Sequence, residues 1–448
     1  MVIIYIMASY SPQLQYVLNR ISGFTTNHFK LQPNGSDSAT ANQIIRIALP
    51  QNSLVNLKSF ALHFDAAITS AGAEGRLPNG VGIGSLIERV EITCGGLQIA
   101  AGSNFYNVLA MAKQAVMGDM CDPLLGHPEV VRDKSYHTSA GTNGITSNKE
   151  VAASYVVDKW CGFLGSVSPS IIDLALLPEM VIQITLAANA VCIDASGTGF
   201  TGSTQFTGTP ANAAPIYQLT NIYATVECVG MADGTYESMV SAQMSQVGYL
   251  ELPFKQYLSF QDSTKSSMKF SVASQSISRI WIVHRDNNYN TPGGAVRITG
   301  HLTDATAAGA FNHVLEYNKE RYTSKYFNFP QPQAGSTHWL TINGAMVPQW
   351  QATQEDMLCI TKNSVLGGKH QMKYGLRTVL DNYDVFCVRL NLPESEFTNT
   401  LTGLDSRGIT ANMFYNMVGV NADKNINIFV ECDSTLRIGQ GLQCEVLS

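Results

Sequence analysis

A segment in the first third of the chain has a counterpart in its last third. Residues 91–118 have the pattern of a strand, a Gly-Gly turn, a short strand and a helix, and residues 341–367 repeat that pattern. Aligning Gly95 with Gly344 sets an offset of 249 (344 − 95), which keeps the turn, the apolar helix face and the terminal glycine in register. Such a repeat indicates an internal duplication, so the chain should contain two copies of one structural unit.

The two predicted helices share an apolar stripe whose members are three and four residues apart, which is the spacing of one helix face. We predict that this face packs against the strands of each unit and marks the same corner in both copies. The stripe consists of Val108, Leu109 and Val116 in the first copy, and of Met357, Leu358 and Val365 in the second.

A second pair of segments recurs in the same order. Residues 53–65 align with residues 276–286, and this alignment pairs His63 with His284. The separation between this segment and the glycine turn is 28 residues longer in the second copy (58 − 30). We place the additional residues within 287–337.

Alternating apolar residues, which are typical of half-buried strands, occupy much of both copies. Polar or small residues dominate three long stretches, at 118–154, 194–214 and 287–337, which we predict to be loops. The chain is therefore expected to be all-β, with two β-sandwiches in tandem and short helices inserted in each. Its 448 residues also exceed what one core usually supports.

Helix-spaced apolar residues between the two copies predict a linker, and a Pro-Asn-Gly-Ser turn signal ends the first segment of the chain. These features divide the chain into four parts. They are an N-terminal arm (1–35), a first sandwich (36–232), a helical linker (233–247) and a second sandwich (248–448).

The chain carries few charged side chains. Asp, Glu, Lys and Arg make up 14% of its residues, against about 25% in typical soluble proteins. Two interpretations fit: a sandwich with neutral Ser/Thr/Asn-rich loops, or a subunit that buries broad faces against its neighbours. The net charge of −6 and the lack of a dense Lys/Arg run argue against direct nucleic-acid binding.

Nine cysteines are scattered through the chain, and none forms a Cys-x-x-Cys pair. Several lie in apolar strand patterns, where a reduced cysteine behaves as a small hydrophobe. This usage favours a reducing compartment and predicts neither a disulfide framework nor a zinc site. No stretch reaches the ~20 apolar residues that a membrane-spanning helix needs.

Motifs for catalysis are missing or incomplete. His284-Arg285-Asp286 resembles part of a kinase catalytic loop, but the required asparagine is displaced by one position and the companion motifs are absent. The histidines show no metal-ligand spacing. Residues 405–408 (Asp-Ser-Arg-Gly) fit either a simple turn or an ion-paired interface loop. We therefore predict no enzyme activity, no cofactor and no metal site.

Three stretches carry a family resemblance. They are residues 85–96 with the helix that follows, residues 402–408, and the closing strand pair at 426–446. Within two tandem sandwiches, they resemble the double jelly-roll major capsid proteins of tailless icosahedral double-stranded DNA viruses. That lineage includes adenovirus-like, polinton-like, virophage and nucleocytoplasmic large DNA viruses. The resemblance implies two eight-stranded jelly rolls in one chain.

The resemblance also implies a structural role in a virion shell. Three chains around a threefold axis would present 3 × 2 = 6 similar jelly rolls, which make a pseudo-hexameric capsomer able to tile an icosahedral capsid. The implied partners are other copies of the chain, neighbouring capsomers, penton and minor or cement proteins, and an internal membrane where the virus has one. Assembly would take place in the host cytoplasm or nucleus. The three long loops would form tower or trimer contacts, and the N-terminal arm would lie at the base.

A carbohydrate-binding or adhesive β-sandwich protein, such as a fibre or lectin-like protein, is the alternative function. It would need an exposed aromatic platform with Asp or Asn side chains nearby. An enzyme would instead need convergent titratable groups in a cleft, and the sequence offers no such group of residues.

Overall fold

The computed structural model describes most of the chain. The described residues are 24–68, 75–76, 83–100, 102–117, 153–194, 215–231, 235–263, 265–297, 322–366, 382–392, 401–408, 412–419, 423–439 and 441–448. The first 23 residues of the predicted arm, nearly all of the predicted loops at 118–154 and 194–214, and residues 298–321 of the third lie outside the described residues. The described parts of the third predicted loop contain two short paired strands, at Ala295–Arg297 and Tyr322–Ser324, which the sequence did not predict.

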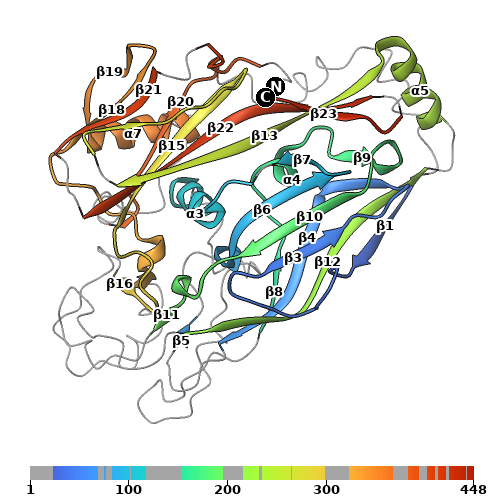
Figure 1. Cartoon of the computed structure of the whole chain (residues 1–448), viewed down its shortest axis with the longest axis horizontal. Coiled ribbons are helices and arrows are strands. Elements are labelled where there is room, and N and C mark those ends of the chain that lie inside the picture. Colours follow the sequence, from blue (N-terminus) through green and yellow to red (C-terminus); the bar gives the residue numbers. More distant parts are fainter. Residues whose placement is uncertain are drawn as a thin grey trace, which may run out of the picture.

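Strands from the first half of the chain form two antiparallel sheets, one of six strands and one of four, that enclose a core (Figure 1). One sheet has the order β1-β12-β4-β8 (Phe24–Leu31, Tyr217–Met231, Leu54–Ile68, Ala153–Val157), with β2 (Ala39–Thr40) and β9 (Ile171–Asp173) added at its margins. The other has the order β3-β10-β6-β7 (Ile44–Ala48, Met180–Leu186, Ile87–Cys94, Leu97–Ala100).

Strands from the second half repeat this arrangement. One sheet has the order β13-β22-β15-β20 (Tyr249–Ser263, Lys424–Gly439, Ile277–Asp286, Val385–Arg389), and β23 (Cys444–Leu447) pairs with β22. The other has the order β14-β21-β18-β19 (Ser267–Lys269, Met413–Val418, Thr337–Ile342, Ala345–Thr353). Taken in chain order, the eight strands of these two sheet orders match the eight of the first half one to one, so each has a counterpart at the same place in the other sandwich. β2, β9 and β23 lie outside this correspondence.

Helices are few and short. α3 (Tyr106–Met117) follows β7, α7 (Gln354–Leu366) follows β19, and α5 (Thr235–Val247) joins the two halves. A reciprocal capping box begins α7: the Asp356 N–H donates to Thr353 Oγ1 (3.3 Å) and the Thr353 N–H donates to Asp356 Oδ2 (3.1 Å). Among the described residues, the remaining elements are α4 (Phe163–Ser166), η1 (Ile83–Leu86), η4 (Leu174–Leu176), η5 (Asn189–Val191), η7 (Lys325–Phe327), β5 (Gly75–Arg76), β11 (Ile193–Asp194), β16 (Ala295–Arg297) and β17 (Tyr322–Ser324).

The predicted all-β class with two tandem sandwiches is confirmed, but the predicted arm at 1–35 is too long. β1 occupies residues 24–31 and pairs with β12 along its whole length. It is the counterpart of β13, the first strand of the second sandwich. The sequence did not predict β1 because Thr25–Lys30 are exposed at the sheet edge, and even Phe29 is 44% exposed. A strand that buries so little of itself shows no apolar alternation.

The glycine turn is present in both copies, although the predicted offset is wrong by one residue. The central turn residues are Gly95 and Gly96 in the first copy, and Asn343 and Gly344 in the second, all with positive φ. This is the two-residue turn that tight β-hairpins favour. The structural offset is therefore 248 (344 − 96), and it also relates the starts of α3 and α7 (354 − 106).

The predicted alignment of His63 with His284 selects equivalent strands, β4 and β15, but opposite faces of their sheets. The His63 ring lies on the outer face, where it stacks on Tyr223 with 4.7 Å between centroids. The His284 ring points into the second sandwich, 5.9 Å from the ring of Tyr415. Side chains alternate with a period of two, so an error of one residue transfers a side chain to the other face.

Candidate assembly site between the two sandwiches

The outer face of the β13-β22-β15-β20 sheet packs against the first sandwich. Ile280 and Ile282 of β15 face the interior of the second sandwich, whereas Trp281 and Val283 belong to the core of the first. α3 lies between the two sandwiches (Figure 1) and contacts both β20 and α7. One hydrophobic cluster therefore continues from the first sandwich into the second. We call this region the joint.

A buried ionic network crosses the joint. Glu431 on β22 accepts a hydrogen bond from Arg279 Nη1 (3.1 Å), and Lys255 Nζ lies 3.8 Å from the same oxygen. From the first sandwich, Lys113 on α3 donates to the Tyr257 hydroxyl (2.8 Å). Burial by itself would raise the pKa of Glu431, but the three cations outweigh it and hold the pKa below its usual value. Glu431 is therefore ionised at neutral pH.

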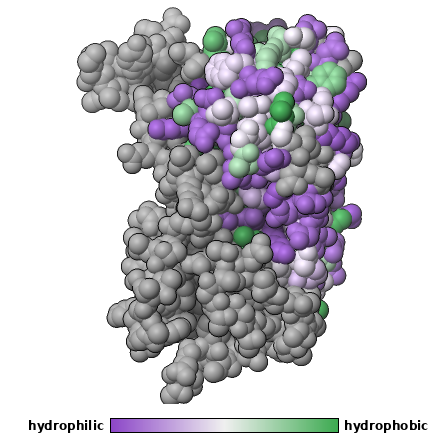
Figure 2. Space-filling model, turned by 90° about the vertical axis from the view of Figure 1, so that its left-hand side faces the viewer, coloured by the Kyte–Doolittle hydropathy of each residue, from purple (hydrophilic) through white to green (hydrophobic). Residues whose placement is uncertain are grey.

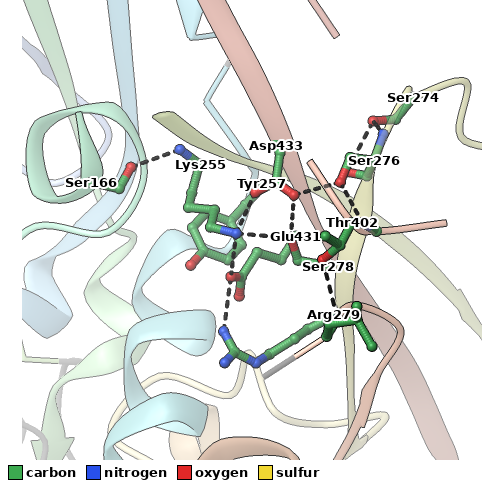
Figure 3. A network of polar contacts seen from close by, with 12 residues as sticks. Ser166, Lys255, Tyr257, Ser274, Ser276, Ser278, Arg279, Thr402, Glu431 and Asp433 are labelled. Atoms are coloured by element: carbon green, nitrogen blue, oxygen red, sulfur yellow. Dashed lines mark hydrogen bonds and ion pairs between the residues drawn. The ribbon is translucent and has the colours of Figure 1, made fainter. Parts of the chain in front are cut away.

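A second carboxylate extends this network toward α4 (Figure 3). Lys255 Nζ forms an ion pair with one oxygen of Asp433. The other oxygen accepts hydrogen bonds from Ser276 Oγ (2.6 Å) and Ser278 Oγ (2.7 Å). The backbone N–H of Lys255 donates to Ser166 Oγ on α4 of the first sandwich (2.7 Å). Side chains of three strands and one helix thus converge at the joint.

The network contributes orientation more than net stability. Removing charges from water costs about as much free energy as their mutual attraction returns. Each charge nevertheless needs its partner at one position, and removing a partner leaves the others buried and uncompensated. The network therefore favours one placement of the sandwiches, and the apolar cluster around it supplies the cohesion.

Another contact of the joint lies at the start of α3. Glu88 on β6 accepts hydrogen bonds from the Phe105 N–H (3.2 Å) and the Tyr326 hydroxyl (2.9 Å). The guanidinium of the buried Arg285 lies 4.6 Å from the centre of the Phe105 ring and 3.8 Å from that of Tyr289. Burial raises the pKa of Glu88 more than its hydrogen bonds and Arg285 lower it. Phe105 thus anchors the first sandwich in an aromatic and cationic pocket of the second.

The predicted helix residues have unequal surroundings. The α3 members are all buried in the core of the first sandwich: Val108, Leu109 and Val116. In α7, Met357 is buried in the core of the second sandwich, Leu358 is half-buried, and Val365 packs against the cluster that crosses the joint. The helices follow equivalent strands and touch each other at the joint. α3 is surrounded by protein, whereas α7 keeps an exposed side.

The residues of the kinase-like triplet lie in three different environments. His284 is buried in the second sandwich, where its Nε2 is 3.3 Å from the Tyr415 hydroxyl. The same hydroxyl is 2.8 Å from Nδ1 of His338. Arg285 faces the joint, and Asp286 forms an ion pair at the end of β15. Burial lowers the pKa of His284 well below its usual value and that of His338 to about 4.

Residues 405–408 form a turn that is closed by an internal ion pair. Arg407 Nη2 lies 2.6 Å from Asp405 Oδ2, and both side chains are more than half exposed. Between them, the buried Ser406 donates to the Val272 carbonyl (2.6 Å) and so attaches the turn to the second sandwich. These contacts agree with the simpler of the two predicted interpretations.

Metal and membrane signals are both missing from the part of the chain that the structure describes. Within it, no three His, Cys, Asp or Glu side chains lie close enough to share a metal ion. None of its helices is long and apolar enough to cross a bilayer. The cysteines in these ranges are free thiols: Cys94, Cys161, Cys192, Cys228, Cys359, Cys387, Cys432 and Cys444.

Solved structures of viral capsid proteins match nearly the whole chain. The VP54 protein of PBCV-1, in a structure fitted into a reconstruction of the virophage Sputnik, has a TM-score of 0.57 and 14% identity over 96% of this chain and 98% of that chain. The Faustovirus major capsid protein has a TM-score of 0.55 and 10% identity, covering 96% and 92%. A chain of the Sputnik virophage has a TM-score of 0.52 and 10% identity, covering 95% and 89%. The chain has the double jelly-roll fold.

The likeness is one of fold rather than sequence, since no family model and no curated protein matches the chain. In this double jelly roll, the joint residues were the ones that sequence reasoning missed. One signal was available: Glu431 follows directly on the apolar run of residues 428–430. A charged side chain in a buried strand needs a partner, but the sequence does not show which residue provides it.

Proposed function

We propose that this protein is a major capsid protein whose homotrimers are the capsomers of an icosahedral virion. The observation that carries the proposal is the joint, which unites two similar jelly rolls into one block. A block of this kind, repeated three times around an axis, supplies six similar faces for lateral contacts. The role is structural and involves no catalysis.

The double jelly roll supports this role because the matched structures include the Faustovirus major capsid protein and the PBCV-1 capsid model. In the same proposal, neighbouring capsomers, penton and minor or cement proteins, and an internal membrane where one is present, are the partners. The loops at 118–154, 194–214 and 287–337 provide tower or trimer contacts. The protein resides in the virion after assembly in the host cytoplasm or nucleus.

Sedimentation velocity of the purified full-length chain tests the trimer directly. We expect a species of three times the monomer mass of 48.6 kDa at micromolar concentration. Negative-stain images of the same sample should show particles with a hexagonal outline. A stable monomer over this concentration range would contradict the capsomer, and specific binding on a glycan array would favour the carbohydrate-binding alternative.

A further inference from the structure

Within the chain, the joint is made by two unlike faces. The first sandwich supplies the segment from β7 to α3, with Phe105 inserted beside Arg285. The second supplies the outer face of its β13-β22-β15-β20 sheet. Because the sandwiches share one topology, each also has the counterpart of the face that the other uses. The second sandwich has a β19–α7 segment, and the first has the outer face of β1-β12-β4-β8.

The β19–α7 segment presents a large apolar side chain to solvent. Trp350 lies on β19, four residues before α7, and is 52% exposed. Its indole Nε1 is 3.5 Å from Asp356 Oδ2 in the first turn of the helix. Gln349 and Gln351 on either side are exposed as well, as is Cys359 one turn further along α7. An exposed tryptophan with a polar surround is the composition of an interface hot spot.

The counterpart sheet face of the first sandwich is polar and organised by its own contacts. Tyr223 on β12 lies between His63, stacked at 4.7 Å between ring centroids, and Lys30, whose Nζ is 4.0 Å from the ring centre. His63 Nε2 is 2.9 Å from Thr225 Oγ1. These side chains are half-buried, except that of Lys30, which is exposed. The equivalent face of the second sandwich is covered within the chain.

The β19–α7 segment and the outer face of the β1-β12-β4-β8 sheet lie at opposite ends of the molecule. In Figure 1 the β18–β19 hairpin is at the upper left, and β1 and β12 are at the lower right. Figure 2 views the molecule from the left-hand side of Figure 1, and its described surface is mainly hydrophilic with scattered apolar residues. Contacts between unlike faces at opposite ends run head to tail, and they close into a ring when the rotation allows it.

We propose that the β19–α7 segment of one copy docks on the outer face of β1, β12 and β4 of the next copy, with Trp350 as its anchor. The contact repeats between copies the docking of the β7–α3 segment within the chain, with Trp350 on β19 as the anchor in place of Phe105, whose counterpart by the offset of 248 is Thr353. This inference rests on the proposed trimer and specifies its interface. The receiving face is polar, whereas the joint buries a continuous apolar cluster around its charges, so the chain folds first and associates afterwards as a separable unit.

The test compares single substitutions by sedimentation velocity of the full-length protein. Trp350→Ser removes the anchor, and Tyr223→Glu disrupts the receiving face. Ile44→Ser is the matched control, since Ile44 is 50% exposed on β3 of the other sheet of the first sandwich. We expect Trp350→Ser and Tyr223→Glu each to weaken association about 30-fold or more. The control should remain trimeric, and urea unfolding should show that all three variants fold.

Mixing the two interface variants tests the direction of the contact. Each variant keeps one intact face, so the mixture should form heterodimers at high concentration but no closed trimer. Wild-type affinity in both variants, or a closed trimer from the mixture, would overturn the proposed interface but not the proposal that the protein forms trimeric capsomers. A wild-type protein that stays monomeric would instead overturn the capsomer itself.

Discussion

β4 and β15 hold the same place in the two sandwiches but have different surroundings. Along β4, buried residues mostly alternate with half-buried ones, as in a sheet with one face toward the core. Along β15, eight of ten residues are buried, because one face lines the second sandwich and the other lies in the joint. The sheet that contains β4 is therefore an outer wall, with one face toward solvent. The equivalent sheet that contains β15 is an internal layer, covered on both faces.

α3 and α7 differ in a similar way. α3 fills the space between the sandwiches, whereas α7 lies along the edge strand β20. There the Thr361 hydroxyl accepts a hydrogen bond from the Cys387 N–H (2.8 Å), and it lies within donating distance of the carbonyls of Met357 (2.8 Å) and Val385 (3.2 Å). Ser364 Oγ accepts from the Arg389 N–H (3.3 Å). The helix thus satisfies strand groups that would otherwise remain unpaired at a sheet edge.

The largest expected effect comes from Glu431→Ala in the internal layer. Arg279 and Lys113 would stay buried without their counter-charge, which should lower the free energy of unfolding by about 3–5 kcal/mol. Glu227→Ala on the outer wall is the control, because the half-buried Glu227 accepts only a peripheral hydrogen bond from Asn56 (2.9 Å), and its loss should cost about 1 kcal/mol. Urea unfolding monitored by circular dichroism measures both. Equal losses would contradict the distinction between wall and layer.

Acid should weaken the second sandwich through His338. Its pKa is about 6.5 in the unfolded chain and about 4 when buried, so the unfolded state binds more protons between these values. Stability is therefore lost as the pH falls from 6.5 to 4, by roughly 3 kcal/mol. His284 acts in the same direction, whereas the buried Asp384, whose pKa is raised, opposes it.

The contribution of His338 is isolated by comparing urea midpoints of wild type and His338→Phe from pH 7 to pH 4.5. The variant should be less stable at pH 7 but should lose less stability on acidification. His63→Phe on the outer wall is the matched control and should change the pH dependence less, because His63 is only partly buried. A His338→Phe variant with the wild-type pH dependence would show that His338 is not the group that titrates.

The smallest expected effect concerns the edge of β20. Thr361→Val keeps the shape of the side chain but leaves the Cys387 N–H without its acceptor, which should cost about 1–3 kcal/mol. Hydrogen exchange should accelerate at Cys387 more than at amides of β15. Asn363→Ala, on the exposed side of the same helix, should change neither quantity. If the Cys387 amide exchanged as slowly in Thr361→Val as in the wild type, the claim that α7 covers the edge of β20 would be wrong.

The sequence by itself determined the duplication, the all-β class and most strands. These are local properties: alternation has a period of two along a strand, and the tight turn needs residues such as Gly95 and Gly96 that accept positive φ. The one-residue errors arose because an alignment with few identities does not define a register, and His63 and His284 consequently face opposite sides of their sheets.

Only the tertiary structure decided which faces are covered. β1 became visible through its pairing with β12, since an exposed edge strand leaves no apolar pattern in the sequence. Lys113 and Glu431 are 318 positions apart (431 − 113), and no local spacing connects them. The folded chain brings both into the joint, where burial makes a compensating charge necessary. The positions of most strands thus follow from local sequence patterns, whereas the joint depends on how the two folded sandwiches pack against each other.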